Sequence, residues 1–340
     1  MIGISNSDRG FNPIWIKYCE ANGIPFKKID CYSNEVMHQL HGCKALMWHH
    51  SHSHSKDIVM AKQLLNACQQ AGITVFPDFN TAWHFDDKVG QKYLLEAIQA
   101  PIIPSFVFYE KETALKWIME TTFPKVFKLR GGASAANVRL VKNSNEAQDI
   151  VNKAFGSGFK QYNAFENLQE RWRKFRKGKG TLTDLAKGVA RIYQEPEFSK
   201  TMGKERGYVY FQEFLPNNGY DIRLIVIGKK AYGMKRLVRK NDFRASGSTE
   251  FEYGTIDDEV LKIAFDVAAR LRLQTVAFDF IYNEEQKPMI VELSYGFGTT
   301  GSSKCKGYWD QNLFWHEGEF NPQGWMVDLV SEQMKNDSNK

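Results

Sequence analysis

The sequence predicts a protein of mixed α/β and α+β class, built from more than one structural unit. Three observations support this. The first eighty residues alternate short apolar runs with helical stretches, a pattern typical of an open sheet of parallel strands. From Tyr208 onward, long strand-like runs dominate the chain. The length of 340 residues exceeds what one small core usually supports.

An N-terminal α/β unit is predicted over residues 1–80. Its four predicted strands are Ile2–Ile4, Phe26–Ile29, Ala45–Trp48 and Ile73–Phe76. Apolar residues recur at helical spacing over Pro13–Asn22 and Lys56–Ala71, and Gly23 and Gly72 stand where helices commonly end. Strands that alternate with helices in this way indicate a parallel sheet.

A second unit is predicted over residues 81–206. Its predicted helices and strands are Lys88–Ala97, Phe106–Tyr109, Thr113–Thr122, Pro124–Leu129 and Val138–Val141. The last two strands form a hairpin whose tip is the small-residue loop Arg130–Asn137. The remainder of the unit has few strand signals and contains the basic run ERWRKFRKGKG.

A C-terminal unit is predicted over residues 207–340. Its predicted strands are YVYFQEFL, DIRLIVIG, AYGMKRLV, TVAFDFIY and MIVELSYG, with a helix at Asp257–Leu271. The final segment contains Trp309, Trp315 and Trp325, and we expect it to cover the C-terminal lobe.

Composition narrows the function classes. The net charge of +6 favours anionic ligands, but the basic residues form no dense stripe, so nucleic-acid binding is not expected. The start of the chain lacks a signal-peptide pattern, and no run reaches the ~18–20 apolar residues of a membrane span. Five scattered cysteines without a CxxC pair suit a reducing compartment. We therefore expect a cytoplasmic protein without membrane insertion.

Two acidic residues lie on the last pair of predicted strands. If Tyr282 pairs with Met289, then Asp279 lies directly opposite Glu292. Facing carboxylates destabilise a sheet unless a cation joins them, and Mg²⁺ binds one or two carboxylates together with phosphate oxygens. The pair predicts a metal site to which Ser294 adds an oxygen from the same face. The alternative is a solvent-facing sheet with unrelated acids.

Cations and free backbone groups surround this acid pair in the sequence. Asp221 and Arg223 share one face of their strand, and Arg236 and Arg244 follow on the next strand and loop. The segment Gln212–Leu215 ends at a proline, which leaves backbone groups free to bond the edge of a heterocycle. Several cations near an acid pair favour an anion and metal site. A solvated basic sheet face is the alternative.

A lysine closes the apolar strand that precedes the small-residue loop. Lys128 suits a phosphate, with the backbone N–H groups of the loop RGGASAAN closing over it. The alternative is an ordinary hairpin turn that contains glycine.

The order of these features resembles the ATP-grasp superfamily, and in particular the branch of the ribosomal-S6-type glutamate ligases and other carboxylate–amine ligases. The resemblance spans about residues 80–298 and is most specific in QEFLPNNGYDIRLIVIGKKAYGMKRLVRKNDFR. It implies an ATP-grasp fold, in which an N-terminal open α/β domain precedes two lobes that hold ATP between them.

The resemblance also implies roles for individual residues. The implied cofactor-binding residues are Lys88, Lys128, Gly131, Gly132, Ala133, Ser134, Gln212, Glu213, Phe214, Leu215 and Asp221. Among them the lysines would hold phosphates under a lid at Gly131–Ala136, residues 213–215 would border adenine, and Asp221 would approach the ribose. The implied Mg²⁺ ligands are Asp279, Glu292 and Ser294. The implied catalytic residues, which would hold the carboxylate and acyl-phosphate oxygens, are Arg236, Arg244 and Arg223.

Two positions depart from the family pattern. Ser294 and Ser246 stand where the family usually has asparagine. Serine is a shorter and weaker ligand, so the number of metal ions, one or two, stays open. The loop GGASAAN is also poorer in glycine than usual, which suggests a stiffer lid.

Two further segments are rich in histidine or in basic residues but match no defined motif. The run His49–His54 holds half of the eight histidines and follows a predicted strand, which favours substrate contact or a polar loop over a metal site. The basic segment Arg171–Lys179 is typical of a solvated helix face; contact with an acidic substrate and binding of nucleic acid are its alternatives.

The resemblance implies an ATP-dependent carboxylate–amine ligase that forms an amide through an acyl phosphate, with ATP and Mg²⁺ as cofactors. The resemblance also implies that the substrates are a small-molecule carboxylate and an amine. The basic charge and the aromatic tail suit an acidic sugar joined to an amino acid. The tail is also similar to those of ATP-grasp proteins associated with surface-polysaccharide gene products. A kinase and a non-catalytic ATP-binding regulator are the alternatives. Nothing in the sequence sets the oligomeric state, and a homodimer is the commonest default.

Overall fold

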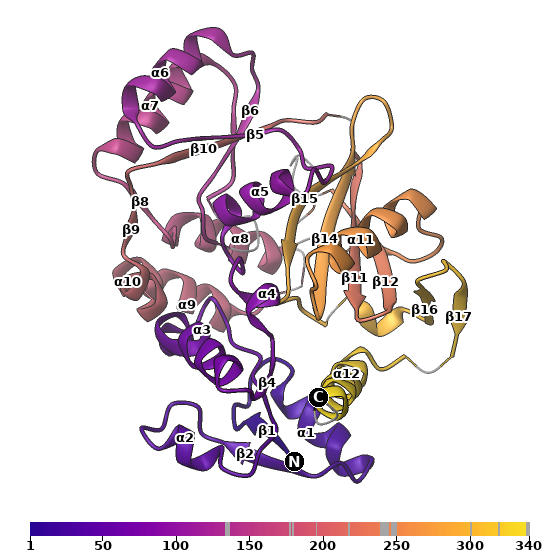
Figure 1. Cartoon of the computed structure of the whole chain (residues 1–340). Helices are drawn as coiled ribbons and strands as arrows, with labels where there is room; N and C mark the ends of the chain where they lie inside the picture. Colours follow the sequence, from indigo (N-terminus) through magenta and orange to yellow (C-terminus); the bar gives the residue numbers. More distant parts are fainter. Residues whose placement is uncertain are drawn as a thin grey trace.

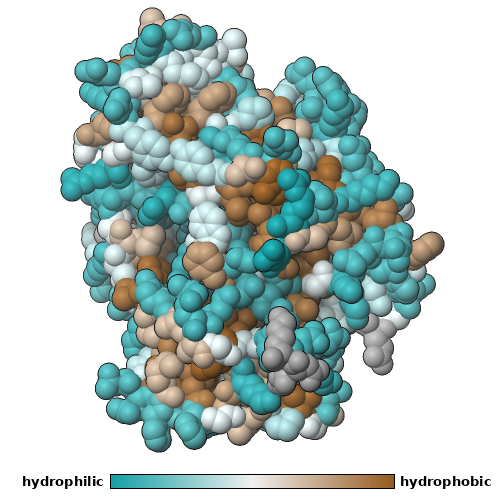
Figure 2. All heavy atoms as spheres, in the orientation of Figure 1, coloured by the Kyte–Doolittle hydropathy of each residue, from teal (hydrophilic) through white to brown (hydrophobic). Residues whose placement is uncertain are grey.

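In the part of the chain that it describes, the computed structural model contains three sheets of three or more strands and one short two-stranded sheet (Figure 1). It describes residues 1–132, 137–176, 178, 180–194, 196–216, 218–238, 245, 250–299, 301–318 and 320–337. The visible face is mostly hydrophilic, with hydrophobic residues showing in several separate places (Figure 2). Within the described residues, no helix has the length and apolar character needed to cross a membrane.

The N-terminal unit is a four-stranded parallel sheet in the order β2-β1-β3-β4. Its strands are β1 (Ile2–Ser5), β2 (Phe26–Ile29), β3 (Ala45–Met47) and β4 (Thr74–Phe76). Its helices are α1 (Asn12–Ala21), α2 (Val36–Gln39) and α3 (Ser55–Gln70). The strands and long helices predicted here are confirmed within one or two residues, because each strand is a short apolar run bounded by a turn.

The second sheet is antiparallel throughout, in the order β5-β10-β6-β7. Its strands are β5 (Ser105–Phe108), β6 (Lys125–Lys128), β7 (Arg139–Val141) and β10 (Val209–Glu213). Helices α6 (Lys111–Glu120) and α7 (Ser144–Phe155) share a core with it. The expected hairpin between β6 and β7 is present. Strand β10 joins this sheet although it lies within residues 207–340, the range predicted for the C-terminal unit.

Three further helices follow α7 in the described part of the segment that leads to β10. They are α8 (Ala164–Arg176), α9 (Leu182–Tyr193) and α10 (Glu197–Met202), flanked by the short pair β8 (Phe159–Lys160) and β9 (Lys204–Glu205). Helices α8 and α9 pack on each other, and α10 packs on α3 of the N-terminal unit. The part of the basic run up to Arg176 lies on α8, and residues 177 and 179 of the run lie outside the described residues.

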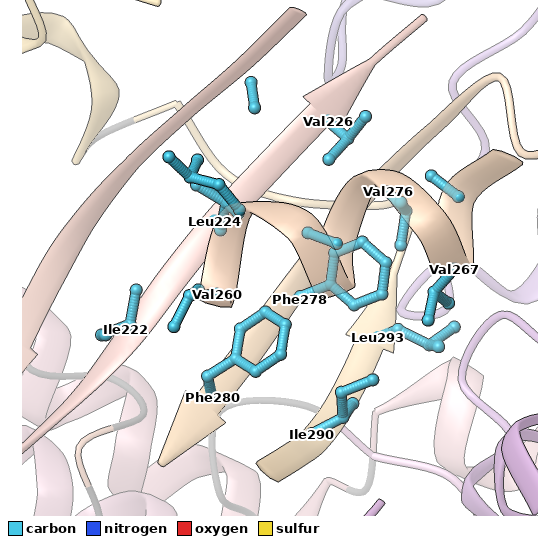
Figure 3. Close-up of a cluster of buried hydrophobic side chains, with 14 of the residues drawn as sticks. Ile222, Leu224, Val226, Val260, Val267, Val276, Phe278, Phe280, Ile290 and Leu293 are labelled. Carbon is cyan, nitrogen blue, oxygen red and sulfur yellow. The ribbon is translucent and has the colours of Figure 1, made fainter. Parts of the chain in front are cut away.

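The third sheet is the largest, and its strands all come from the C-terminal half of the chain. Its strands are β11 (Tyr220–Ile227), β12 (Lys230–Leu237), β13 (Phe251–Glu252), β14 (Thr275–Tyr282), β15 (Pro288–Ser294), β16 (Gly307–Asp310) and β17 (Trp315–Glu317). Helix α11 (Asp258–Arg270) covers one face, where apolar side chains from the helix and from β11, β14 and β15 meet (Figure 3). Burial of each large side chain there contributes roughly 1.5–3 kcal/mol.

The C-terminal helix makes contacts beyond those expected. The final segment packs on the C-terminal lobe as expected, through α12 (Pro322–Asp337) on β11, and α12 also packs on α1 and β4. Met326 and Val330 share one core with Trp15 of α1 and Ile225 of β11. The helix lies beside α1 at the base of the molecule in Figure 1. It therefore joins the N-terminal unit to the third sheet.

Candidate functional site

A cavity of about 650 Å³ lies where the three units meet. Helix α5 (Lys88–Ala97) supplies Lys88, the second sheet supplies Lys128, and the third sheet supplies most of the remaining wall. The predicted site residues that line it are Lys88, Lys128, Gly132, Gln212, Glu213, Phe214, Leu215, Asp221, Arg223, Arg236, Asp279, Glu292 and Ser294. The fold thus gathers side chains that are up to 206 positions apart in the sequence, from Lys88 to Ser294.

The acidic residues of β14 and β15 face each other, as predicted. Asp279 pairs with Glu292, but the premise about the neighbouring pair was wrong, since Tyr282 pairs with Pro288 rather than Met289. A β-bulge between Asp279 and Phe280 shifts the register by one residue and restores the expected partner. Bulges of this kind re-aim side chains next to active sites.

Asp279 is the centre of a buried ion network. Arg223 Nε and Nη2 donate to its two oxygens at 2.8 and 2.9 Å, and Arg236 Nη2 lies 2.7 Å from Oδ2. Arg236 also donates from Nε to Asp221 Oδ1 at 2.7 Å. Burial alone would raise the pKa of Asp279, but the two guanidinium groups outweigh it and hold that pKa well below its usual range.

Asp221 differs from Asp279 although both bind Arg236. Burial and the nearby charge of Asp279 raise the pKa of Asp221 to about 6, which Arg236 only partly offsets. Both Asp221 oxygens accept hydrogen bonds from Arg236. The network therefore fixes Arg236, and a ribose contact by Asp221 would have to use its remaining lone pairs.

Two lysines lie on the other side of the acid pair. Lys88 Nζ is 3.4 Å from Glu292 Oε1 and donates to the carbonyl oxygen of Gly132 at 2.8 Å. Burial disfavours its charge, but Glu292 and Asp86 raise its pKa on balance. Lys128 Nζ donates to Gln212 Oε1 at 2.6 Å, and burial lowers its pKa to about 8. An anion in the cavity would hold both lysines in the charged form.

The base of the predicted lid is anchored by two carboxylates. Glu205 accepts from the N–H groups of Arg130 and Gly131 at 3.0 and 3.1 Å, and Asp86 Oδ1 accepts from that of Gly132 at 2.8 Å. The N–H groups of Gly131 and Gly132 therefore both have carboxylate partners. Gly131 is also absent from the cavity wall described above. The predicted residues Ala133 and Ser134 lie outside the described residues, as do Arg244 and Ser246.

The segment expected to border a heterocycle lies at the end of β10. Glu213 pairs with Lys125, whose Nζ donates to its two oxygens at 2.6 and 2.8 Å. Phe214 and Leu215 follow on the cavity wall, with the apolar side chain of Ile103 among their neighbours in that wall. Gln212 is buried and orients Lys128.

The cavity also contains residues that the sequence analysis missed. His52, Phe85, Asp86 and Phe297 line its end next to the N-terminal unit. Asp86 has a positive φ of 58°, unusual for a residue with a side chain, and burial raises its pKa. The acidic pair before Lys88 in the sequence was a signal that could have suggested Asp86, whereas no pattern marks Phe297.

The histidine run divides between the core and the cavity. Phe11 N–H donates to His49 Nδ1, and burial lowers the pKa of His49 to about 3 and that of His50 well below its usual value. His52 alone of the run lines the large cavity. Among the described residues, no group of three His, Cys, Asp or Glu side chains is arranged to hold a metal ion, so the run does not form one there.

The donor set fits a magnesium–phosphate group. A carboxylate offers about four lone-pair positions, and the described contacts of Asp279 use three of them. Glu292 makes one long contact with Lys88 and is about one-third exposed. Both acids therefore keep acceptor capacity, and Mg²⁺ needs only one or two carboxylates when phosphate oxygens complete its shell. Ser294 is the weakest of the three predicted ligands, because its Oγ already accepts from Gly296 N–H at 3.2 Å.

Comparisons with known proteins agree with this geometry. A model of the RimK-like ATP-grasp domain matches residues 187–310, and no curated protein matches the chain. A RimK-domain ATP-grasp protein from Sphaerobacter thermophilus DSM 20745 is 16% identical, with a TM-score of 0.57 over 97% of this chain and 98% of that one.

Two further solved structures are similar over nearly the whole chain. The ATP-grasp ligase PsnB, in complex with its minimal precursor, Mg and ADP, is 14% identical, with a TM-score of 0.54 and 98% of each chain covered. D-cycloserine synthetase DcsG is 12% identical, with a TM-score of 0.58 over 97% of this chain and 99% of that one. At such identities the likeness shows the fold. The chain therefore has the ATP-grasp fold, and its residues 187–310 match the RimK-like ATP-grasp domain.

Proposed function

We propose that this chain is an ATP-dependent carboxylate–amine ligase. The observation that carries the proposal is the acid pair Asp279–Glu292 facing Lys88 and Lys128 within one cavity. A nucleoside triphosphate with Mg²⁺ needs acids that bind the cation and lysines that bind the phosphates, in one site.

The nucleotide would lie between the second and third sheets. Glu213, Phe214 and Leu215 would border the base at the end of β10, and Lys128 and Lys88 would hold phosphate oxygens. Asp279 and Glu292, with Ser294 as a weaker ligand, would hold Mg²⁺, whose charge lowers the barrier to phosphoryl transfer when it is bound. The volume of about 650 Å³ lies in the range of small-molecule sites.

The two arginines suit the carboxylate to be activated. Arg223 and Arg236 are already oriented by Asp279 and Asp221, so little further ordering is needed when an anion binds. The substrate carboxylate would attack the γ-phosphorus, forming a C–O–P linkage as ADP leaves. An amine would then attack the acyl carbon, forming the amide and releasing phosphate. Arg236, with Arg223 and Arg244, would stabilise the oxyanion of that step.

Two solved relatives support this class of reaction. One is named as an ATP-grasp ligase and was solved with Mg and ADP, and the other is named as a synthetase. For the substrates of this chain, we propose a small carboxylate, an acidic sugar among the candidates, and an amino acid or another amine. The net charge of +6 and the two arginines in the cavity suit an anionic donor.

Trapping with hydroxylamine tests the proposal. We expect hydroxamate and ADP to form together when ATP, Mg²⁺ and a panel of uronic acids and amino acids are supplied, because hydroxylamine captures an acyl phosphate. Asp279→Asn should abolish both products, whereas Glu284→Asn, which removes an exposed acid in the turn between β14 and β15, should not.

The products also separate the alternatives. ADP formed with a stable phosphorylated hydroxyl compound, and without hydroxamate, would indicate a kinase. Binding of ATP with no ADP under any substrate mixture would indicate a regulatory protein. Either result would overturn the ligase assignment.

A further inference from the structure

A second cavity, of about 500 Å³, lies in the C-terminal part of the third sheet. It lies between β12, the segment after β13, and the hairpin formed by β16 and β17. None of the residues that line it lines the large cavity. The Tyr253 hydroxyl donates to the carbonyl oxygen of Gly301 at 2.7 Å, and Gly301 borders the large cavity. The two cavities are therefore neighbours that share no wall residue.

Aromatic side chains form much of the wall of this second cavity. Trp309 and Trp315 come from the paired strands β16 and β17, with ring centroids 4.5 Å apart and planes tilted by 57°. Trp309 is buried, whereas Trp315 is 44% exposed, so part of its surface is open to a ligand. Tyr253 contributes a third ring. Rings of this kind bind flat apolar groups by stacking and edge contacts.

The hairpin geometry depends on one glycine. A Cβ at Gly307 would lie 2.1 Å from the carbonyl oxygen of His316 on the facing strand and 2.8 Å from the Trp315 ring. Any other residue would push β17 away from β16. Gly307 therefore keeps the two tryptophans together at the cavity wall.

The charged side chains described in this wall are positive. Lys304 and Lys306 line the cavity and are exposed, and no aspartate or glutamate is among the lining residues in the described part of the chain. Two cations beside an aromatic wall attract an anion that also carries an apolar surface.

We propose that this second cavity binds a small carboxylate attached to a flat ring, with the ring against Trp315 and the carboxylate at Lys304 and Lys306. The ring can be aromatic or a pyranose, since both present a flat apolar face. The site lies outside the cavity that we assign to ATP, so the proposal goes beyond the ligase function and does not depend on it.

Ligand-observed NMR and calorimetry on the full chain test the proposal with defined probes. Benzoate and glucuronate represent the two ring types, and benzyl alcohol and methyl glucoside are their uncharged counterparts. We expect at least one of the acids to bind in this second cavity, and its uncharged counterpart to bind there at least threefold more weakly. Binding of benzoate alone assigns an aromatic ring and binding of glucuronate alone a pyranose, whereas binding of neither overturns the proposal.

Paired variants place the binding in this cavity. Lys304→Gln with Lys306→Gln should weaken the acid about three- to tenfold, because each exposed ion pair contributes about 0.2–1 kcal/mol. The charge-matched control, Lys262→Gln with Lys335→Gln, changes exposed lysines on α11 and α12 and should have no effect. Trp315→Ala should also weaken binding, whereas Phe314→Ala, which changes an exposed neighbour outside the wall, should not. Equal affinities across these pairs would contradict the assignment.

Cys305 gives a local readout in the same protein. It lines the cavity, and the other four cysteines are buried. Because burial raises the pKa of the Cys305 thiol to about 11, its alkylation by iodoacetamide is slow and can be followed by mass spectrometry. A probe bound in the cavity should slow this alkylation at least twofold. An unchanged rate at saturating probe would show that the probe binds elsewhere.

Discussion

Four charged side chains form one network at the cavity wall, in which Asp221, Arg236 and Asp279 are buried and Arg223 is partly exposed. Replacing buried ions with apolar residues is often neutral or even stabilising, so such a network is weak evidence of a contribution to stability. We infer that it persists because it fixes two guanidinium groups where a substrate anion would bind. At the residue scale, function explains these charges better than stability does.

Buried neutral histidines predict a pH dependence of stability. Burial lowers the pKa of His84 to about 4, below its ordinary value of 6.5. The unfolded chain therefore binds more protons than the folded chain between these values. Stability contributed by the neutral ring is complete above pH 6.5 and is lost as the pH falls toward 4.

The expected effect can be measured by urea unfolding at pH 7.5 and pH 5. His84→Phe should reduce the loss of unfolding free energy on acidification by about 1–2 kcal/mol. His38→Phe, which changes an exposed histidine in α2, is the matched control and should leave the acid sensitivity unchanged. The same acid sensitivity in His84→Phe and wild type would show that His84 does not titrate in this way.

At the element scale, the loop that follows β6 begins at a point held by side-chain hydrogen bonds. Glu205 on β9 accepts hydrogen bonds from two consecutive N–H groups at its base. Glu205→Ala would leave these groups without their carboxylate partner. We expect faster cleavage by trypsin after Arg130, since the backbone there would open more often.

The matched control for this prediction is Glu197→Ala. Glu197 lies in the first turn of the neighbouring helix α10, away from the loop contacts. Quantitative mass spectrometry of early tryptic fragments would compare the two variants. Equal cleavage after Arg130 in Glu205→Ala and wild type would show that Glu205 does not anchor the loop.

The helix α12 makes a second prediction at this scale. Met326 is fully buried in the core that joins α1 to β11. Met326→Ala should lower the free energy of unfolding by about 2–5 kcal/mol, because it leaves a cavity between two units. Met119→Ala, at a 75% exposed position on α6, should change it by less than about 0.5 kcal/mol. Chemical denaturation followed by circular dichroism distinguishes these results.

The elements show where sequence reasoning succeeds and where it fails. The parallel sheet at the N-terminus and the facing acids on β14 and β15 could be predicted, because apolar runs, turns and strand alternation are local signals. The bulge beside Asp279 could not be predicted, since nothing in the local pattern marks an extra residue. The contacts of Glu205 with Arg130 and Gly131 and those of α12 with α1 could not be predicted either, because they join segments far apart in the sequence.

At the scale of the whole molecule, all three units contribute to the large cavity. Residues from the N-terminal unit, the second sheet and the third sheet line it, and α12 packs against both the first unit and the third sheet. We propose that the three units of the sequence, residues 1–80, 81–206 and 207–340, act as parts of one site. The position of β10 in the second sheet places a strand of the last unit within the middle one.

Binding of ATP with and without Mg²⁺ tests the central claim most directly. Calorimetry on the full chain should show ATP binding that Mg²⁺ strengthens at least tenfold. Asp279→Asn with Glu292→Gln should remove that dependence on Mg²⁺, whereas Glu284→Gln with Glu285→Gln, in the exposed turn between the same strands, should retain it. The same Mg²⁺ dependence in the Asp279 and Glu292 double variant as in wild type would contradict the assignment of these acids to the metal.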